Sequence, residues 1–303
     1  MPANRLRANL ILLLVAAIWG LAFVAQRVGM DHLGPFGFNA ARFALGALSL
    51  LPLTLVFRAR AGQAQPRQLL HGGLLAGTLL FCGASLQQVG LQYTTAGNAG
   101  FITGLYIVLV PLAAWMLGQA INSGVWTGSA LAVAGLYLLS IDETMKINRG
   151  DLLELAGAGF WAAHVLVIGR LAPTVDGLRL SIVQFWVCAL LCFGCALLFE
   201  SDSLTLQNLS LAWKPIAYAG LLSVGVAYTL QVYAQKNTPA AHAAIIMSLE
   251  AVFAVLGGWL MLHETLGLRT LLGCALMLAG MLLAQLPSRR SPPGSAGQTV
   301  KET

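Results

Sequence analysis

Long uninterrupted runs of apolar residues constrain this chain more than any other feature of its sequence. Runs of about 20 such residues, the length that crosses a ~30 Å hydrocarbon core as a helix, use up nearly the whole chain of 303 residues. Only 9% of the residues are charged, against roughly 25% in soluble domains. The chain is therefore predicted to be an all-α integral membrane protein without a soluble catalytic domain.

The apolar runs predict ten transmembrane helices. They are expected at residues 9–28, 35–57, 69–91, 95–118, 124–141, 151–171, 178–199, 213–235, 239–262 and 267–286. The predicted organisation is a cytoplasmic leader at 1–8, a first five-helix repeat at 9–141, an outer linker at 142–150, a second five-helix repeat at 151–286, and a disordered tail at 287–303.

The second half of the chain repeats the first. Shifted by 145 positions, residues 93–135 fall on residues 238–280, and a polar turn keeps its place. Identical residues at this offset include Met116 and Met261, Gly128 and Gly273, and Gly135 and Gly280. Because each half holds an odd number of helices, the second enters the membrane from the opposite side, which predicts an inverted repeat. Two such halves can rock about a site near the membrane midplane, as in an alternating-access carrier.

The distribution of lysine and arginine predicts the orientation. With the N-terminus in the cytoplasm, eleven basic residues fall in inner segments and five in outer ones, with Arg42 left inside a helix. Since cytoplasmic loops are rich in these residues, both termini are expected in the cytoplasm. The net charge of +6 is therefore a signal of topology, and no nucleic-acid partner is expected.

Two ionisable residues stand near the membrane midplane. Glu250 lies in the middle of the ninth predicted helix, where an acid costs at least ~2.5 kcal/mol. Its repeat counterpart is Leu105, so the acid is not part of the duplicated scaffold. His164 in the sixth helix titrates in the range that suits a proton relay. Both are predicted to bind substrate or a proton, and the alternative for both is a structural role between helices.

Two tryptophans and an arginine also lie at depth. Trp19 and Trp161 are equivalent in the two halves and stand near mid-helix, away from the interface where tryptophan gathers. They are predicted to wall a cavity, with packing against glycines as the alternative. Arg42 is predicted to bind an anionic group or to snorkel outward. Glu154 shares a helical face with Trp161 and is expected to be a solvated residue near the outer end.

Polar residues also cluster where the third and eighth predicted helices end. They are Gln87, Gln88, Gln92, Tyr93 and Asn98 in the first half, and Tyr228, Gln231, Tyr233, Gln235 and His242 in the second. Matching positions predict gates or cavity linings at the two membrane faces, and solvation of helix ends is the alternative. The small-xxx-small spacings Gly100–Gly104 and Gly124–Gly128 are common signals of close helix contact.

Signatures of soluble enzymes and metal sites are missing from the sequence. There is no GxxxxGK[ST], HExxH or GxSxG motif. The five cysteines lie inside apolar runs and lack further ligands at suitable positions. They are Cys82, Cys188, Cys192, Cys195 and Cys274. No cofactor and no metal are therefore predicted.

Three stretches together resemble EamA-type transporters of the drug/metabolite transporter superfamily. They are WGLAFVAQR, GLQYTTAGNAGFITGLYIVLVPLAAWMLGQ and MSLEAVFAVLGGWLMLHETLGLRTLLGCALMLAG. The resemblance covers residues 10–285 and implies ten helices in two inverted halves, a central cavity, and export of amino acids, other metabolites or drugs. In the family, the acid of the ninth helix is commonly followed by proline. Here Ala251 follows Glu250, so the usual cause of a kink is missing.

The prediction is a secondary transporter of the bacterial inner membrane that exports a small organic solute through a central cavity. The residues expected to line it are Trp19, Arg42, Tyr106, Trp161, His164, Tyr228 and Glu250. Protons are a candidate coupling ion, with Glu250 and His164 as the groups that bind them. The expected partners are the solute and the lipid bilayer, and the sequence specifies neither the solute nor an oligomeric state.

The alternative function is an integral-membrane enzyme acting on a lipid or lipid-linked substrate, with Glu250 and His164 as acid and base. These two groups would have to reach a common substrate. The repeat favours transport, because an enzyme has no need of two inverted halves.

Overall fold

The computed structural model describes residues 3–56, 66–94, 96–140, 149–262 and 267–284, and every regular element in these ranges is a helix. The elements are α1 (Ala3–Gly29), α2 (Pro35–Val56), α3 (Pro66–Gly90), α4 (Ala96–Gly104), α5 (Tyr106–Met116), α6 (Ser123–Ser140), α7 (Arg149–Leu171), α8 (Gly177–Phe199), α9 (Leu206–Leu211), α10 (Trp213–Ala217), η1 (Tyr218–Tyr228), α11 (Thr229–Gln235), α12 (Ala240–Met247), α13 (Glu250–Leu262) and α14 (Leu268–Ala284). The predicted tail at 287–303 lies outside the described residues.

Seven stretches of helix are long and apolar enough to cross a membrane. They are Asn4–Gly29, Pro35–Val56, Pro66–Gly90, Arg149–Leu171, Gly177–Phe199, Trp213–Gln235 and Ala240–Gly257. Three shorter apolar helices cover Ile102–Met116, Ser123–Leu138 and Leu268–Ala284. The prediction of an all-α chain is confirmed for the part that the structure describes. The first helix begins at Ala3, inside the predicted leader.

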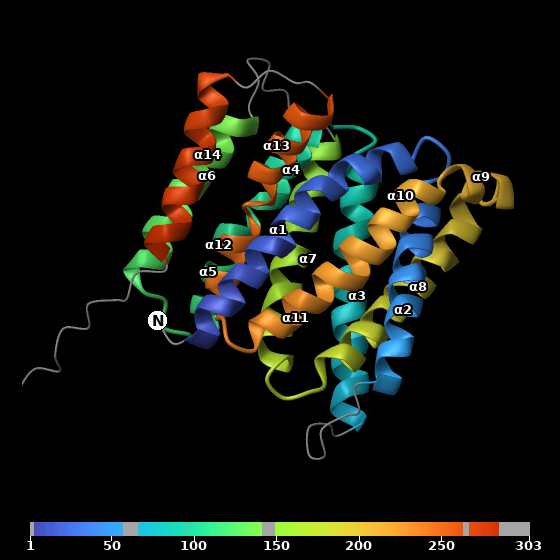
Figure 1. Ribbon diagram of the computed structural model, residues 1–303, viewed down its shortest axis with the longest axis horizontal. Helices are drawn as coiled ribbons and strands as arrows, with labels where there is room; N and C mark the ends of the chain where they lie inside the picture. Colours follow the sequence, from blue (N-terminus) through green and yellow to red (C-terminus); the bar gives the residue numbers. More distant parts are fainter. Residues whose placement is uncertain (1–2, 57–65, 95, 141–148, 263–266, 285–303) are drawn as a thin grey trace, which may run out of the picture.

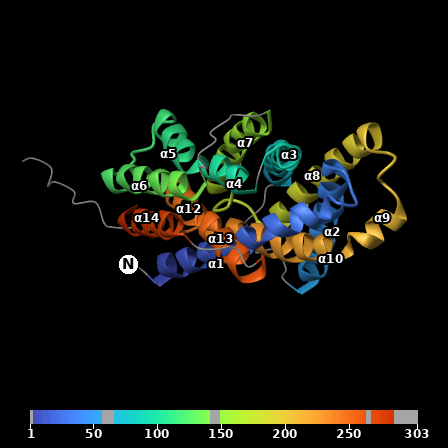
Figure 2. The same ribbon diagram turned by 90° about the horizontal axis from the view of Figure 1, so that it is seen from above.

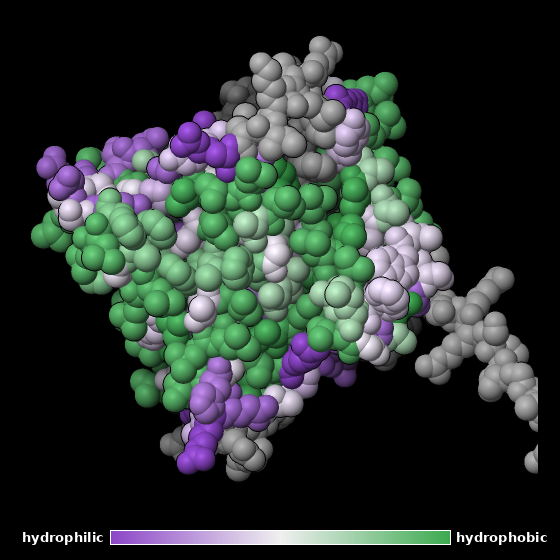
Figure 3. Space-filling model, turned by 180° about the vertical axis from the view of Figure 1, so that it is seen from behind, coloured by the Kyte–Doolittle hydropathy of each residue, from purple (hydrophilic) through white to green (hydrophobic). Residues whose placement is uncertain are grey.

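The helices form one bundle with a hydrophobic band across its middle. α6 and α14 pack together at one end of the bundle, and α2 and α8 pack together at the other, next to the short α9 (Figures 1 and 2). α1, α3, α7 and the broken helices lie between these two pairs. Figure 3 shows hydrophobic side chains across the middle of one face and hydrophilic ones above and below. This distribution suits a bundle surrounded by lipid.

Glycines bring α6 and α14 into backbone contact. A Cβ placed on Gly128 would lie 2.5 Å from the carbonyl oxygen of Gly280, and one on Gly135 would lie 2.6 Å from that of Gly273. The close contact predicted from Gly124 and Gly128 is therefore confirmed, whereas a Cβ on Gly100 would meet no described atom within 4 Å. At the offset of 145, Gly128 is equivalent to Gly273 and Gly135 to Gly280. Gly128 thus packs against the repeat equivalent of Gly135, and Gly135 packs against the repeat equivalent of Gly128.

Gly128→Ala is expected to destabilise the protein by about 1–3 kcal/mol, because the added methyl group forces two helix backbones apart. Gly159→Ala is the matched control, since nothing lies within 4 Å of a Cβ at this exposed site on α7. Alanine is the better helix former, so the control should be neutral or stabilising. Thermal unfolding of both variants in the same detergent measures the difference. Equal melting temperatures would contradict a close α6–α14 contact.

A second pair of glycine contacts joins the two halves near α2 and α8. On α3, a Cβ on Gly73 or Gly77 would meet Val183 or Val187 of α8, at 2.4 and 2.6 Å. On the other side of the bundle, Gly46 of α2 meets Val224 of η1 in the same way, at 2.3 Å. Thus α3 packs on α8 in the same way as η1 packs on α2.

An acid of the second half caps a helix of the first. Glu200 ends α8, and its carboxylate accepts hydrogen bonds from the backbone N–H groups of Phe36 (3.1 Å) and Gly37 (2.8 Å). The hydroxyl oxygen of Ser203 accepts from the N–H of Gly34 at 3.2 Å. These bonds satisfy donors that the first turn of a helix leaves unpaired, and the negative charge suits that end of the helix dipole. The start of α2 is thereby fixed to the end of α8.

Two of the predicted membrane helices are interrupted within two residues of equivalent positions. The fourth breaks at Leu105, between α4 and α5, and the ninth breaks at Ser248–Leu249, between α12 and α13. Leu105 (φ −62°, ψ −14°) and Ser248 (φ −61°, ψ −14°) have nearly the same backbone angles, close to those of a 3₁₀ turn. At each break a backbone N–H bonds to the carbonyl three residues earlier, from Leu105 to Ile102 and from Leu249 to Ile246. The ninth helix is therefore interrupted even though Ala251 replaces the family's proline.

Candidate functional site

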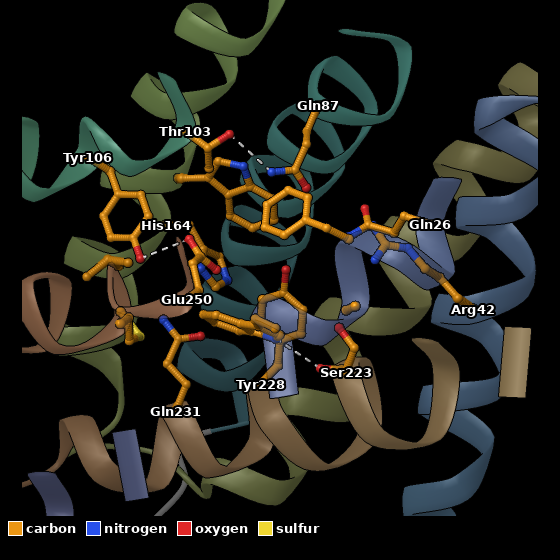
Figure 4. Close-up of a pocket in the computed structure, with 16 residues that line it drawn as sticks. Gln26, Arg42, Gln87, Thr103, Tyr106, His164, Ser223, Tyr228, Gln231 and Glu250 are labelled. Carbon is orange, nitrogen blue, oxygen red and sulfur yellow. Dashed lines mark hydrogen bonds between the residues drawn. The ribbon is translucent and has the colours of Figure 1, made fainter. Parts of the chain in front are cut away.

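Both helix breaks face one cavity inside the bundle. The cavity holds about 510 Å³ of space, part of it open to the outside. It is lined by Trp19, Ala22, Phe23, Gln26, Arg42, Gln87, Thr103, Tyr106, Trp161, His164, Val165, Ser223, Tyr228, Gln231, Met247 and Glu250. All seven residues named from the sequence are in this set (Figure 4). Their roles toward a solute stay predictions.

Aromatic rings form one wall of the cavity around Tyr228. The rings of Trp19 and Tyr228 lie 4.6 Å apart, and Trp161 stacks on Tyr228 at 6.2 Å. The indole N–H of Trp19 donates to the carbonyl of Ser223 at 3.2 Å, which fixes its ring. Gly83 lets Trp161 approach α3, since a Cβ there would lie 3.1 Å from the indole. Tryptophan at this depth thus both packs against glycine and faces the cavity.

Glu250 begins α13, immediately after the break in the ninth helix. Its Oε1 accepts a hydrogen bond from the hydroxyl of Tyr106 at 3.3 Å (Figure 4). Tyr106 itself begins α5, immediately after the break in the fourth helix. Gly20 of α1 allows close approach from the other side, because a Cβ there would lie 2.5 Å from the backbone oxygen of Glu250. The two interrupted helices are therefore joined at the cavity by an acid and a phenol.

Arg42 is a buried cation whose hydrogen-bond partner in the described part of the chain is uncharged. Its side chain is 2% exposed and belongs to α2, across the cavity from Glu250 in Figure 4. Its Nε donates to the side-chain oxygen of Asn39 at 2.9 Å, and its guanidinium lies 4.8 Å from the centre of the Phe43 ring. No acid pairs with it among the residues that the structure describes. The Nη groups, which form the fork that binds carboxylates, make no hydrogen bond to the described residues.

His164 is fully buried on α7 and has one free ring nitrogen. Its Nε2 donates to the side-chain oxygen of Gln184 at 2.9 Å, and Nδ1 has no hydrogen-bond partner among the described residues. The His164 ring also stands edge-on to Tyr228, 6.1 Å away. The packing role and the cavity role considered from the sequence are therefore both compatible with its position.

Glu154 differs from its predicted environment. It was expected to be solvated near the outer end, but its side chain is 0% exposed. Its Oε2 accepts a hydrogen bond from the hydroxyl of Thr103 at 3.0 Å, and Thr103 accepts one from the Gln87 amide at 3.2 Å. The prediction was wrong because distance from the helix end does not reveal the packing of α4 on α7.

Thr103, Gln26, Ser223 and Met247 line the cavity and were not singled out in the sequence. For Thr103 the repeat carried a signal, since its equivalent at the offset of 145 is Ser248. Thr103 lies two residues before Leu105, and Ser248 lies two residues before Glu250. Each hydroxyl is therefore next to a helix break.

Glutamines of the third and eighth helices bridge to the backbone of a neighbouring helix. Gln88 of α3 donates to the carbonyl of Gln26 on α1 at 3.2 Å. Gln235 of α11 donates to the carbonyl of Val165 on α7 at 2.9 Å, and Gln231 donates to Gln235. These side chains are 0–3% exposed, so solvation of helix ends does not explain them. They hold together the first and third helices of each predicted repeat.

Comparison with known proteins identifies the family. The profile of the EamA-like transporter family matches the chain twice, over residues 6–141 and residues 148–286. The chain belongs to the EamA-like transporter family. It is therefore a multi-pass membrane transporter, as the resemblance to the drug/metabolite transporter superfamily implied.

EamA-like relatives cover most of the chain. An uncharacterized transporter of Archaeoglobus fulgidus is 32% identical, over 93% of this chain and 87% of its own. The threonine/homoserine exporter RhtA of Salmonella typhimurium is 29% identical, over 86% of this chain and 84% of its own. A solved crystal structure with 20% identity has a TM-score of 0.78 and covers 94% of this chain and 98% of its own, which shows the shared fold.

Proposed function

We propose that this EamA-like protein is a secondary active transporter that exports a small organic metabolite, such as an amino acid or a drug, by alternating access. The observation that carries the proposal is the meeting of two interrupted helices at one cavity. Interrupted helices at corresponding positions of two halves are typical of substrate sites in secondary transporters. Here the breaks place Thr103 and Tyr106 of the first half, and Met247 and Glu250 of the second, on the cavity wall.

Ten membrane helices in two inverted repeats are part of the proposal. Joining α4 to α5, α12 to α13, and α10 to α11 through η1 gives ten membrane helices, with α9 outside them. The crossed glycine contacts, Gly128 with Gly280 and Gly135 with Gly273, support a two-fold axis between α6 and α14, because such an axis exchanges equivalent residues. The paired contacts of α3 with α8 and of η1 with α2 support the same axis.

The cavity chemistry favours a solute that carries both a carboxylate and an amino group. The free Nη groups of Arg42 suit a carboxylate, and Glu250 across the cavity suits an ammonium group or a proton. The aromatic wall around Tyr228 can cover the apolar part of such a molecule. The relative RhtA is named as a threonine/homoserine exporter, which agrees with this chemistry.

Coupling and orientation complete the proposal. We assign proton coupling to Glu250 and His164, an acid and a histidine that both line the cavity. We place the protein in the bacterial inner membrane with both termini in the cytoplasm, on the distribution of lysine and arginine. The membrane-enzyme alternative is less favoured. Glu250 bonds to Tyr106 and His164 to Gln184, and no bond joins the two in the described part of the chain.

Flux of a labelled solute panel through proteoliposomes tests the proposed function. Purified protein is expected to exchange at least one labelled amino acid or drug across the membrane, with saturation and without chemical change to the solute. Empty liposomes provide the control. A solute that is recovered chemically altered would support an enzyme instead, and absence of flux for the whole panel would contradict the proposal.

A further inference from the structure

A row of polar side chains, called the polar file below, leads from one end of the bundle to the cavity. Asp151 in the first turn of α7 is half-buried and accepts a hydrogen bond from the hydroxyl of Thr94 at 2.5 Å. Glu154 lies three residues further on, on the same helical face. From Glu154 the file continues through Thr103 to Gln87, and both of these line the cavity. With the N-terminus in the cytoplasm, this file begins at the outer membrane face.

The carboxyl group of Glu154 packs closely against α3. A Cβ on Gly90 would lie 2.8 Å from Glu154 Oε1, so the glycine allows this close approach. Among the described residues, the buried Oε1 has no hydrogen-bond partner and Oε2 has a single donor, Thr103. An ionised carboxylate can accept about four hydrogen bonds, and the described residues donate one to Glu154.

No cation compensates a charge on Glu154 in the described part of the chain. The titratable side chains of the helices packed on α7 are Arg67, His71 and Cys82 on α3, Tyr106 on α5, Tyr233 on α11 and His242 on α12, and none of them bonds to Glu154. Asp151 is close enough to act on it and is itself an acid. Arg149 at the start of α7 lies over the Tyr93 ring, 5.5 Å from its centre. A buried unpaired carboxylate is costly, and a protonated carboxyl group costs far less.

The geometry points to Glu154 as a second proton-binding site, which exchanges protons with the outer face past Asp151 and acts on the broken fourth helix through Thr103. This inference rests on the proposed transport function. Thr103 precedes the break at Leu105 and Tyr106 follows it, so the fourth helix is bonded to Glu154 on one side of the break and to Glu250 on the other. A proton taken from outer water neutralises Glu154 and is released to the cytoplasm in the opposite state, which restores the carboxylate.

Infrared difference spectroscopy of the purified protein in lipid tests the site without any solute. At neutral pH the wild type should show the C=O stretch of a protonated carboxyl group, and Glu154→Gln should lose a component that Asp202→Asn retains. Asp202 is the matched control because it is an exposed acid outside the file. A spectrum of Glu154→Gln that matches the wild type would overturn the inference. Glu250→Gln identifies any component due to the cavity acid.

Thr103→Val provides a second variant that keeps the acid. It should shift the stretch frequency of the Glu154 component, because it removes the one hydrogen bond that the described residues make to that carboxyl group. Thr78→Val is its control, since Thr78 is exposed on α3 and bonds to the carbonyl of Leu74 in its own helix. An unshifted band in Thr103→Val would overturn the link to the fourth helix.

A transport assay distinguishes failure of this inference from failure of the proposed function. With L-threonine as the probe, Glu154→Gln should lose accumulation driven by a pH gradient on the order of tenfold, and should keep threonine exchange without a gradient. Gradient-driven accumulation at the wild-type level in this variant would overturn the coupling role. If the wild type carries no L-threonine and no other panel solute, the proposed transport function fails, whereas the infrared result still decides whether Glu154 holds a proton.

Discussion

Arg42→Gln is expected to reduce solute exchange in proteoliposomes by about 10- to 100-fold, because a hydrogen bond to a charged group contributes about 1.5–3 kcal/mol. Exchange of the solute found in the panel, at a concentration below saturation, measures the loss. Arg42→Lys should fall between the variant and the wild type, since lysine keeps the charge and loses the planar fork. Arg27→Gln is the matched control, because Arg27 is exposed at the end of α1.

The same variant separates binding from folding. Arg42 is buried without an acid partner in the described residues, so its removal should leave the melting temperature unchanged or raise it. A loss of exchange together with equal or higher thermal stability would identify a residue retained for function. Wild-type exchange in Arg42→Gln would contradict its assignment to the solute.

Glu250→Gln and His164→Ala are each expected to impair transport driven by a pH gradient, on the order of tenfold. In Glu250→Gln the amide oxygen can still accept the hydrogen bond from Tyr106, so the contact between the two broken helices is preserved while the ionisable group is lost. Uptake with and without an imposed gradient in proteoliposomes measures the effect.

Exposed residues of the same types serve as controls for this pair. Asp202→Asn and His71→Ala remove an acid and a histidine at exposed positions, and both should behave like the wild type. If Glu250→Gln and His164→Ala both keep wild-type uptake and pH dependence, the assignment of coupling to the cavity residues is wrong.

Composition and apolar runs were sufficient to predict an all-α chain with membrane-length helices, because apolar runs of that length have few alternative structures. The cavity residues could be named for a related reason. Arg42, Glu250 and His164 are costly at depth, so each needs a buried environment that the bundle has to supply. The sequence therefore indicated which side chains are unusual, and the packing showed that they face one another.

Three features of the bundle could not be read from the sequence. The break before Glu250 lacks its usual proline, and a tightened turn at Ser248 and Leu249 replaces it. The π-helical segment η1 is rich in small and apolar residues that fit an α-helix equally well, so its wider turns carry no sequence signal. Burial of Glu154 depends on Thr103, which belongs to a helix far away in the sequence.

The cap that Glu200 and Ser203 place on α2 has a mechanical consequence. Three backbone N–H groups, from Gly34, Phe36 and Gly37, lose their acceptors if the ends of α2 and α8 separate. At the opposite end of the bundle, α6 and α14 touch through their backbones and leave little room to slide. Each of the two outermost helix pairs is therefore expected to move as a rigid unit. Any rocking motion of the proposed carrier has to occur among the helices between these pairs, where the two breaks are.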